Sequence, residues 1–245
     1  DDDNTATVNQ DGDSSSYVTQ TNDNATAIVD QTGNGHSSIV AQSGDDDVAD
    51  VDQIGSDNTS SIGQTGNSNT AVVDQSAAGN SSAILQSGGA NFAAATQSSN
   101  NNSSEIAQTS GLNETIVDQT GEDNISAVTQ NGGLFGVASN TANVLQSGSD
   151  NFSQITQGGA GNEAGDASDQ MVRGVIQSGD RNTSTVRQSG GLQDVFVNQM
   201  GDDNTSFVDQ GGTLGTAHYA SVLQSGSLNN AAVTQRGALS DAVIN

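Results

Sequence analysis

The chain has 245 residues, of which 31% are hydrophobic and 3% aromatic, and its formal net charge is −25. So few apolar residues cannot form a core of ordinary depth, and four Arg without Lys cannot form the basic patch that nucleic acid requires. The absence of Cys excludes disulfides and thiolate sites. No apolar run is long enough to cross a bilayer, so membrane insertion is not expected.

A Gln recurs along the chain, mostly at intervals of eleven residues, and we call it position zero of each repeat unit. Position −2 is Val or Ile in 20 of 21 units (counting a last unit that ends at Asn245), position −6 is Asn in 13 of 21, and position +2 is Gly in 16 of 20. The recurring residues are Gln10, Gln20, Gln31, Gln42, Gln53, Gln64, Gln75, Gln86, Gln97, Gln108, Gln119, Gln130, Gln146, Gln157, Gln177, Gln188, Gln199, Gln210, Gln224 and Gln235.

The spacing within a unit predicts a strand followed by a turn. Positions −6, −4, −2 and zero differ by two, which places them on one face of a strand. The Gly at +2 and the polar residues after it are typical of a turn. Each unit is therefore predicted to be a strand of six or seven residues and a turn of about four. The absence of Pro agrees with a chain that is mostly strand.

Position −4 alternates between Ala and Ser in the first ten units, beginning Ala6, Ser16, Ala27, Ser38. The true period is therefore 22 residues, with odd units stacked in one sheet and even units in a second. The predicted fold is all-β, a flattened two-sheet β-solenoid of about ten and a half rungs. Residues 1–245 are expected to form a single domain of this kind.

Stacking explains why polar amides recur at inward positions. In a solenoid each Gln lies roughly 4.8 Å from the Gln of the next rung, so the amides can hydrogen-bond into a ladder that satisfies each member. Position −6 is expected to form a second ladder, in which His36 and His218 replace Asn rather than act as ligands or bases. Its Asn residues are Asn4, Asn58, Asn69, Asn80, Asn91, Asn102, Asn113, Asn124, Asn140, Asn151, Asn182, Asn204 and Asn229.

Three intervals are longer than eleven, and the extra residues are expected near 131–136, 158–169 and 211–216. All three follow even units, which predicts that the extra loops leave from one edge of the solenoid. Counting back from Gln177 puts Arg173 at the inward position −4, where an unpaired charge is costly. We expect local misregister there, or an Arg that escapes into the loop.

The two outward faces differ in chemistry. Odd units place Asp30, Asp52, Asp74 and Asp118 at position −1, a stripe of like charges that favours salt or a divalent cation, or is simply solvated. Even units place more apolar or small residues outward, a face that could meet a neighbouring filament or could be ordinary scattered surface. These residues are Ile39, Ala83, Leu85, Ala127, Phe152 and Phe207.

No sequence pattern indicates catalysis. No Ser–His–acid arrangement stands out, the Gly-rich turns lack the Gly-Lys-Ser/Thr of a phosphate loop, and the G-G-x-G-x-D pattern of calcium-binding repeats does not recur. We therefore expect no enzyme activity, no cofactor and no metal site.

Residues 69–80, NTAVVDQSAAGN, and residues 58–69, NTSSIGQTGNSN, resemble the curlin repeat. The resemblance implies a secreted structural subunit of a curli-type functional amyloid fibre, which serves extracellular biofilm matrix and adhesion. It also implies export through an outer-membrane channel, nucleation by a second subunit, and a role in assembly for the inward Gln and Asn residues.

We expect copies to join end to end, because unpaired strands at the ends of a solenoid can accept another rung. The last unit lacks its Gln, and the first strand of the next copy is expected to complete that rung. The alternative is a monomeric secreted β-solenoid that binds ice or a surface, although Thr-x-Thr does not form the continuous column that ice binding favours. A calcium-dependent secreted repeat protein is less favoured.

Overall fold

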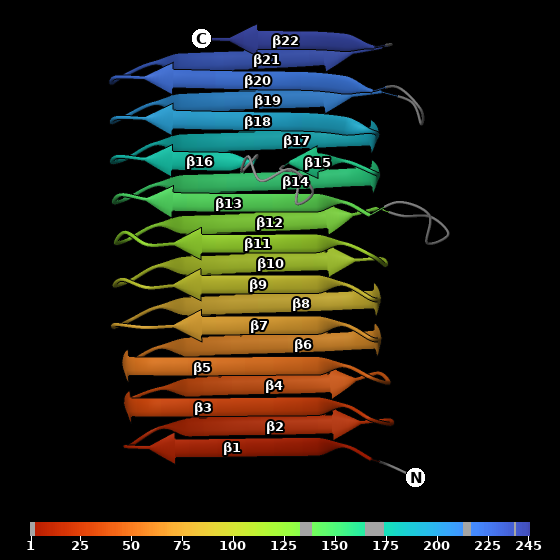
Figure 1. The fold of residues 1–245 in the computed structure, drawn as a ribbon, viewed down its shortest axis with the longest axis vertical. Coiled ribbons are helices and arrows are strands. Elements are labelled where there is room, and N and C mark those ends of the chain that lie inside the picture. The colour runs from red at the N-terminus through yellow and green to blue at the C-terminus, as the bar shows by residue number, and fades with distance from the viewer. Residues whose placement is uncertain (1–2, 133–138, 165–173, 213–216, 238) are drawn as a thin grey trace.

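The computed structural model describes residues 3–132, 139–164, 174–212, 217–237 and 239–245. Within these residues there is no helix, and the strands stack into one column (Figure 1). The predicted all-β solenoid is confirmed. The strands are β1 Thr5–Asp11, β2 Ser15–Thr21, β3 Thr26–Asn34, β4 Ser37–Ser43, β5 Val48–Ser56, β6 Thr59–Asn67, β7 Thr70–Gln75, β8 Ser81–Gly89, β9 Phe92–Gln97, β10 Ser103–Thr109, β11 Glu114–Gln119, β12 Ile125–Asn131, β13 Thr141–Ser147, β14 Phe152–Ala160, β15 Glu163–Ala164, β16 Val175–Ser178, β17 Thr183–Gly191, β18 Gln193–Met200, β19 Thr205–Gly211, β20 His218–Ser225, β21 Asn230–Arg236 and β22 Ser240–Ile244.

The strands form two sheets, as the alternation at position −4 predicts. One sheet follows the order β1-β3-β5-β7-β9-β11-β13-β15-β18-β20-β22, with β16 between β13 and β18, and the other follows β2-β4-β6-β8-β10-β12-β14-β17-β19-β21. We call them the odd sheet and the even sheet after their repeat units. All pairs are parallel and in register, so that Gln31 pairs with Gln53 and Gln42 with Gln64. Adjacent strands of a sheet are therefore 22 residues apart over most of the chain.

The interior between the sheets is narrow. In the odd sheet the buried apolar side chains are mostly Ala at position −4 and Val at position −2, whereas the even sheet has Ser at −4 and Val or Ile at −2. Each buried Val or Ile contributes roughly 1.5–3 kcal/mol, and ordering costs about 1–2 kcal/mol per residue of backbone. Apolar burial is thus insufficient on its own, and hydrogen bonds along the column must supply the remainder.

The turns stack as tightly as the strands. Gly at position +2 has a positive φ in most rungs, for example +103° at Gly66, and a Cβ there would overlap the carbonyl oxygen of Gly88 in the next turn. Position −7, just before the Asn column, is also left-handed, at Asp57, Asn101, Asp123 and Asp203 among others. Short polar side chains tolerate this conformation better than most. The sequence pattern indicated the Gly but not the second left-handed position.

The break before Gln177 differs from the prediction. Ala142 pairs with Ala164, and Val144 pairs with Val175. In the sequence the extra residues of this unit thus fall between Ala164 and Gly174, after β15 and before β16, and not in the turn after Gln157. Ala164, not Arg173, occupies the inward position −4, where it is fully buried.

The other two long intervals begin at even-to-odd turns, after Gly132 and after Gly212. The common edge predicted for all three extra loops is therefore incorrect for the second, which starts within a strand. Residues 133–138, 165–173 and 213–216, and with them Arg173, lie outside the described residues.

Candidate functional site

The Gln side chains at position zero form two continuous ladders, one in each sheet. In the odd sheet the Nε2 of each Gln donates to the Oε1 of the next, from Gln10 to Gln224, at 2.6–2.9 Å. In the even sheet the chain of bonds runs from Gln20 to Gln235 at 2.8–3.2 Å. The ladders pass the interrupted strand without a break, because Gln146 donates to Gln177 and Gln177 to Gln199.

Each Gln from Gln20 onward also ties the two sheets together. Its Nε2 makes a second bond, to a backbone carbonyl at the start of the facing strand: Gln97 donates to Ser81 O at 3.0 Å, and Gln108 to Phe92 O at 2.9 Å. The residues of the central rungs are almost fully buried. Both amide hydrogens are therefore used, which offsets the cost of burying a primary amide.

The Asn side chains at position −6 connect rungs in a different way. The Oδ1 of one Asn accepts the backbone N–H of the Asn in the next rung, as in Asn80 to Asn58 at 3.0 Å and Asn102 to Asn80 at 2.9 Å. The Nδ2 often donates to a turn carbonyl, as in Asn182 to Gly201 O at 2.7 Å. At the edge that precedes the even strands this column is unbroken from His36 to Asn229.

His36 reproduces the contacts of an Asn. Its Nδ1 accepts the N–H of Asn58 at 3.3 Å, and its Nε2 lies 3.1 Å from the carbonyl of Thr32. The two contacts together require the tautomer with its proton on Nε2. The expected substitution of His for Asn is thus seen in the bonding of this residue.

The column that precedes the odd strands is less regular. Asn4, Asn69, Asn91, Asn113 and Asn140 lie in it, and so does Asn162, which the spacing did not predict. Beyond Asn162 the column contains Gln193 and His218, and the Oδ1 of Asn162, the Oε1 of Gln193 and both ring nitrogens of His218 are buried without a hydrogen-bond partner among the described residues. His218 therefore occupies an Asn position without making the bonds of an Asn.

Asn162 could have been found by counting forward. It follows Gln157 by five residues, the distance from Gln75 to Asn80 and from Gln97 to Asn102. Counting back from Gln177 instead assigns position −6 to Met171. The forward spacing holds because the turn after Gln157 is regular and the extra residues come later.

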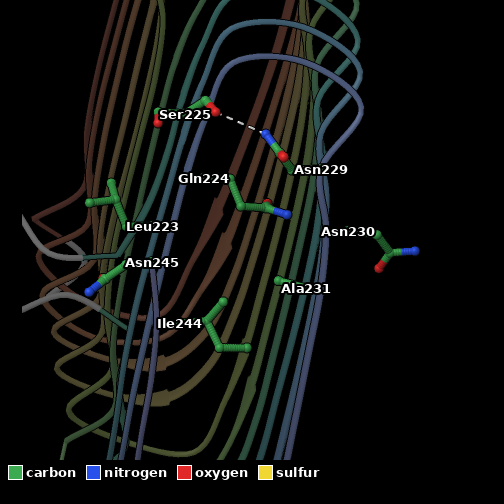
Figure 2. Close-up of a pocket in the computed structure, with 8 residues that line it drawn as sticks. All are labelled: Leu223, Gln224, Ser225, Asn229, Asn230, Ala231, Ile244 and Asn245. Carbon is green, nitrogen blue, oxygen red and sulfur yellow. Dashed lines mark hydrogen bonds between the residues drawn. The ribbon is translucent and has the colours of Figure 1, made fainter.

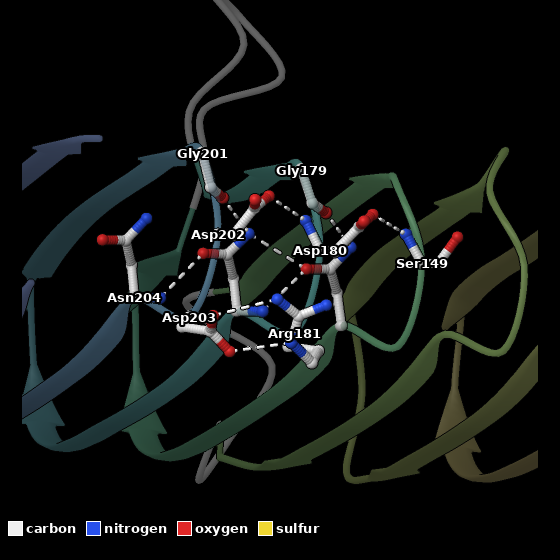
Figure 3. A network of polar contacts seen from close by, with 10 residues as sticks. Ser149, Gly179, Asp180, Arg181, Gly201, Asp202, Asp203 and Asn204 are labelled. Atoms are coloured by element: carbon white, nitrogen blue, oxygen red, sulfur yellow. Dashed lines mark hydrogen bonds and ion pairs between the residues drawn. The ribbon is translucent and has the colours of Figure 1, made fainter. Parts of the chain in front are cut away.

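The turns carry a third series of hydrogen bonds, shown in Figure 3. Asp180 Oδ1 accepts the N–H of Ser149 at 2.9 Å, and Asp202 Oδ1 accepts the N–H of Asp180 at 3.0 Å. Beside them Arg181 forms a two-point ion pair with Asp203 at 2.8 and 2.9 Å. The hydrogen bond from Arg181 lowers the pKa of Asp203. The carboxylates of Asp180 and Asp202, like that of Asp45, thus cap the backbone of the neighbouring rung.

The acidic stripe lies on the outer face of the odd sheet. Asp52 pairs in register with Asp30 on one side and Asp74 on the other. Burial raises the pKa of Asp52, and repulsion from Asp74, Asp30 and Asp50 raises it further. Burial likewise raises the pKa of Asp118. Within the described part of the chain, no group of three or more His, Cys, Asp or Glu side chains has a geometry that could hold a metal ion.

The outer face of the even sheet is mixed in character. Tyr17, Ile39 and Leu85 are about half exposed or more. Nearer the C-terminus Arg187 lies over the ring of Phe207 at 5.8 Å, and Arg236 pairs with Asp209. Tyr17 pairs in register with Ile39, whereas Leu85 lies opposite Gly63 in another column of the sheet.

A shallow groove of about 300 Å³ lies where β21 and β22 end the column (Figure 2). Leu223, Gln224, Asn229 and Ile244 contribute to its lining. Gln224 donates to Thr205 O, and among the described residues no further Gln accepts from it. Gln224, which is itself buried, is thus the last Gln of the odd ladder, and it lies in the lining of this groove.

No helix among the described residues is long and apolar enough to cross a membrane.

Residues 21–55, 44–76 and 55–85 match the family model of the curlin associated repeat. No curated protein and no solved structure gives a significant match. The matched segments cover units that have the same ladders, turns and register as the units after them. Residues 21–85, about a quarter of the chain, are thus similar to the curlin associated repeat.

Proposed function

We propose that the chain is the structural subunit of an extracellular curli-type amyloid fibre, in which copies join end to end. The observation that supports this is the equivalence of the rungs. Each rung presents the same Gln, the same backbone edge and the same inward face to the next one. A rung from a second copy can therefore make the same backbone and Gln hydrogen bonds as a rung of the same chain. Such a head-to-tail contact builds a filament.

The direction of the hydrogen bonds in the ladders supports one orientation of neighbouring copies. Both Gln ladders donate from the rung nearer the N-terminus to the rung nearer the C-terminus. A copy added at the groove beside Gln224 fits when it offers a Gln Oε1, which is the end of the ladder at Gln10 and Gln20. Joining two C-terminal ends would place donors against donors, and joining two N-terminal ends would place acceptors against acceptors. The ladders thus favour filaments in which every copy points the same way.

The family supports the remaining parts of the proposal. Curlin repeats occur in secreted fibre subunits, so we place this chain outside the cell, in a biofilm matrix that aids adhesion and aggregation. Its main partner is another copy of itself, and a nucleating subunit and an outer-membrane secretion channel are proposed as further partners. We assign it no catalytic role.

The experiment is assembly from the denatured chain. Purified protein is diluted from denaturant into buffer and imaged by negative stain over a day, with and without sonicated seeds. Unbranched detergent-resistant filaments that appear sooner with seeds, and whose fibre diffraction shows the strand spacing of about 4.8 Å, are expected. A folded monomer that does not elongate under any seeding condition would reject the fibre and favour a monomeric binding solenoid.

A further inference from the structure

One position of the inner columns has a carboxylic acid where its neighbours have an amide. Asp47 lies at position −6 of the unit that ends at Gln53, and its side chain is completely buried. Its Oδ1 accepts the backbone N–H of Asn69 at 2.9 Å and the Nδ2 of Asn69 at 3.1 Å. These are the contacts that Asn69 Oδ1 makes in turn with Asn91, at 3.3 and 2.9 Å. One oxygen of Asp47 thus acts as the amide oxygen of an Asn.

The other oxygen takes the place of an amide nitrogen. In the equivalent residues that nitrogen donates to the carbonyl at position +2 of a neighbouring turn: Asn58 to Ala77 O at 3.1 Å and Asn69 to Gly88 O at 3.2 Å. For Asp47 the corresponding acceptor is Gly66 O. A methyl group at Gly44 would overlap Gly66 O while lying 2.7 Å from Asp47 Oδ2, so both oxygens border the same small space. Oδ2 has no hydrogen-bond partner among the described residues.

A carboxylate is poorly suited to this place. Its negative oxygen would face a carbonyl oxygen, and an unpaired buried charge is strongly disfavoured. The charged groups around it are Asp45 and Asp46 in its own turn and Asp23 in the turn below. The neighbouring residues of the facing strands and of the turn above are the neutral Ser43, Thr65, Asn67 and Ser68, and every Arg of the chain is at residue 173 or later. No positively charged group is therefore available to pair with a carboxylate, and only the two hydrogen bonds from Asn69 to Oδ1 favour the charged form.

We propose that Asp47 keeps its proton in the folded column and donates it from Oδ2 to the carbonyl of Gly66. The folding of the rungs around β5 is then coupled to the binding of one proton and is favoured by acid. This inference concerns the fold of the column and does not depend on whether copies join into fibres.

Burial raises the pKa of Asp47 and the charges of Asp45 and Asp46 raise it further, while the hydrogen bonds from Asn69 act in the opposite direction. The direction of the pH effect follows from this. Below the pKa of the unfolded chain, near 3.9 for Asp, Asp47 is neutral in both states and its penalty is absent. As the pH rises towards the raised pKa of the folded state, the unfolded chain ionises first and stability is lost. Above that pKa the loss is constant.

The test compares wild type with Asp47→Asn, which supplies the missing N–H donor without a proton from solvent. The readout is the exchange rate of the Asn69 amide hydrogen, because that amide bonds directly to Asp47. Wild type and variant should exchange at similar rates near pH 4, and wild type should exchange increasingly faster as the pH rises to about 8. Each unit by which the folded pKa exceeds the unfolded one corresponds to a tenfold change.

A control variant and an infrared measurement accompany this test. Asp57→Asn removes an exposed carboxylate from the turn at the opposite edge, and its ratio to wild type should not vary with pH. Infrared difference spectra of wild type minus Asp47→Asn at about pH 6 should contain the band of a protonated carboxyl group. A ratio for Asp47→Asn that is constant with pH, or a carboxylate band in its place, would overturn the proposal. All three measurements are made on the folded protein, so failure of fibre growth in the assembly experiment is a separate result.

Discussion

At the scale of single residues, Gln at position zero can be buried because every part of its amide has a partner. Gln97 illustrates this: its Oε1 accepts from Gln75, and its Nε2 donates to Gln119 and to Ser81 O. A shorter amide could not span from one sheet to the other. Gln thus suits this position because its side chain is polar and also long enough to contact the facing strand.

Replacing Gln97 by Met is expected to be strongly destabilising. The substitution keeps the volume but leaves the buried Gln119 Oε1 without its donor and the buried Gln75 Nε2 without its acceptor. Unsatisfied buried groups cost about 1–3 kcal/mol each. We expect a loss on the order of 2–5 kcal/mol, measured as a shift of the denaturant midpoint. Thr96→Ala, one residue away on the outward face, is the matched control and should change the midpoint little. Equal effects of the two substitutions would argue against a stabilising ladder.

His36 provides a second residue-scale prediction. Asn has both the acceptor for the Asn58 N–H and a donor for the turn carbonyl, so His36→Asn should keep the stability of wild type. His36→Leu has similar bulk but neither group, and it should lose on the order of 1–3 kcal/mol. The comparison is made by denaturant unfolding. If the Leu variant were as stable as the Asn variant, packing rather than hydrogen bonding would explain the His.

Most of the inward residues could be predicted, because the period of two within a strand and of eleven between units assigns each position independently. The second bond of each Gln, to the facing sheet, could not, since the offset between two sheets does not follow from a one-dimensional repeat. Asn162 was missed because counting back from Gln177 assumes that extra residues fall in turns.

At the scale of elements, each turn must fit between the turns above and below it. Gly66 has a φ of +103° and no room for a Cβ, whereas Gly63 lies within β6, and a Cβ there would meet only Leu85 Cδ2, at 2.9 Å. The first contact is with backbone and the second with a movable side chain.

Gly66→Ala and Gly63→Ala are therefore expected to differ although the chemical change is the same. The strained backbone at Gly66 costs about 1–3 kcal/mol, and the overlap with the next turn adds to it. Gly63→Ala requires only a rotation of Leu85 and gains strand propensity. Thermal unfolding of the two variants measures the difference. Similar melting temperatures would mean that the turns are not held in register.

The strands of the odd sheet place like charges side by side, which predicts a dependence on salt and pH. Asp52→Asn should raise the unfolding midpoint at low ionic strength, and the gain should shrink as salt screens the stripe. Because the pKa of Asp52 is raised in the folded state, the gain should also shrink as the pH falls towards the unfolded value. Asp123→Asn, in an exposed turn, is the control. A gain that is unaffected by salt would exclude repulsion as its cause.

The interruption between β15 and β16 shows what the pattern could not establish. A strand can be divided when both halves pair with intact strands on each side, and here β13 and β18 pair with both halves. Sequence spacing favours placing extra residues in turns because most insertions fall there. The pairing partners that permit this exception are visible only in three dimensions.

At the scale of the whole molecule, the column is protected unevenly. Gln10 is exposed and Gln20 half-buried, whereas the Gln residues of the central rungs are almost completely buried. Backbone amides of β9 to β12 should therefore exchange most slowly and those of β1, β2, β21 and β22 fastest. If copies join end to end, the four outer strands should become as protected in fibres as the central ones. Outer strands that stay unprotected in fibres would indicate lateral rather than end-to-end contacts.

The fold as a whole was predictable because one 22-residue period fixes strands, sheets and register together, and a single conflicting unit does not disturb the others. The chemistry of Asp47 was not, since an acid at an Asn position is unremarkable in sequence until its second oxygen is seen to face a carbonyl.

The double attachment of each Gln has a mechanical consequence. Because the amide is tied both to the next rung and to the facing strand, a force along the column has to break two kinds of bond before a rung can open. Rungs should consequently detach whole, one after another, and each should release about 22 residues of chain, or roughly 75 Å of extended length. Under tension such a column would not extend elastically. It would unfold in discrete steps of equal length and dissipate work at each one.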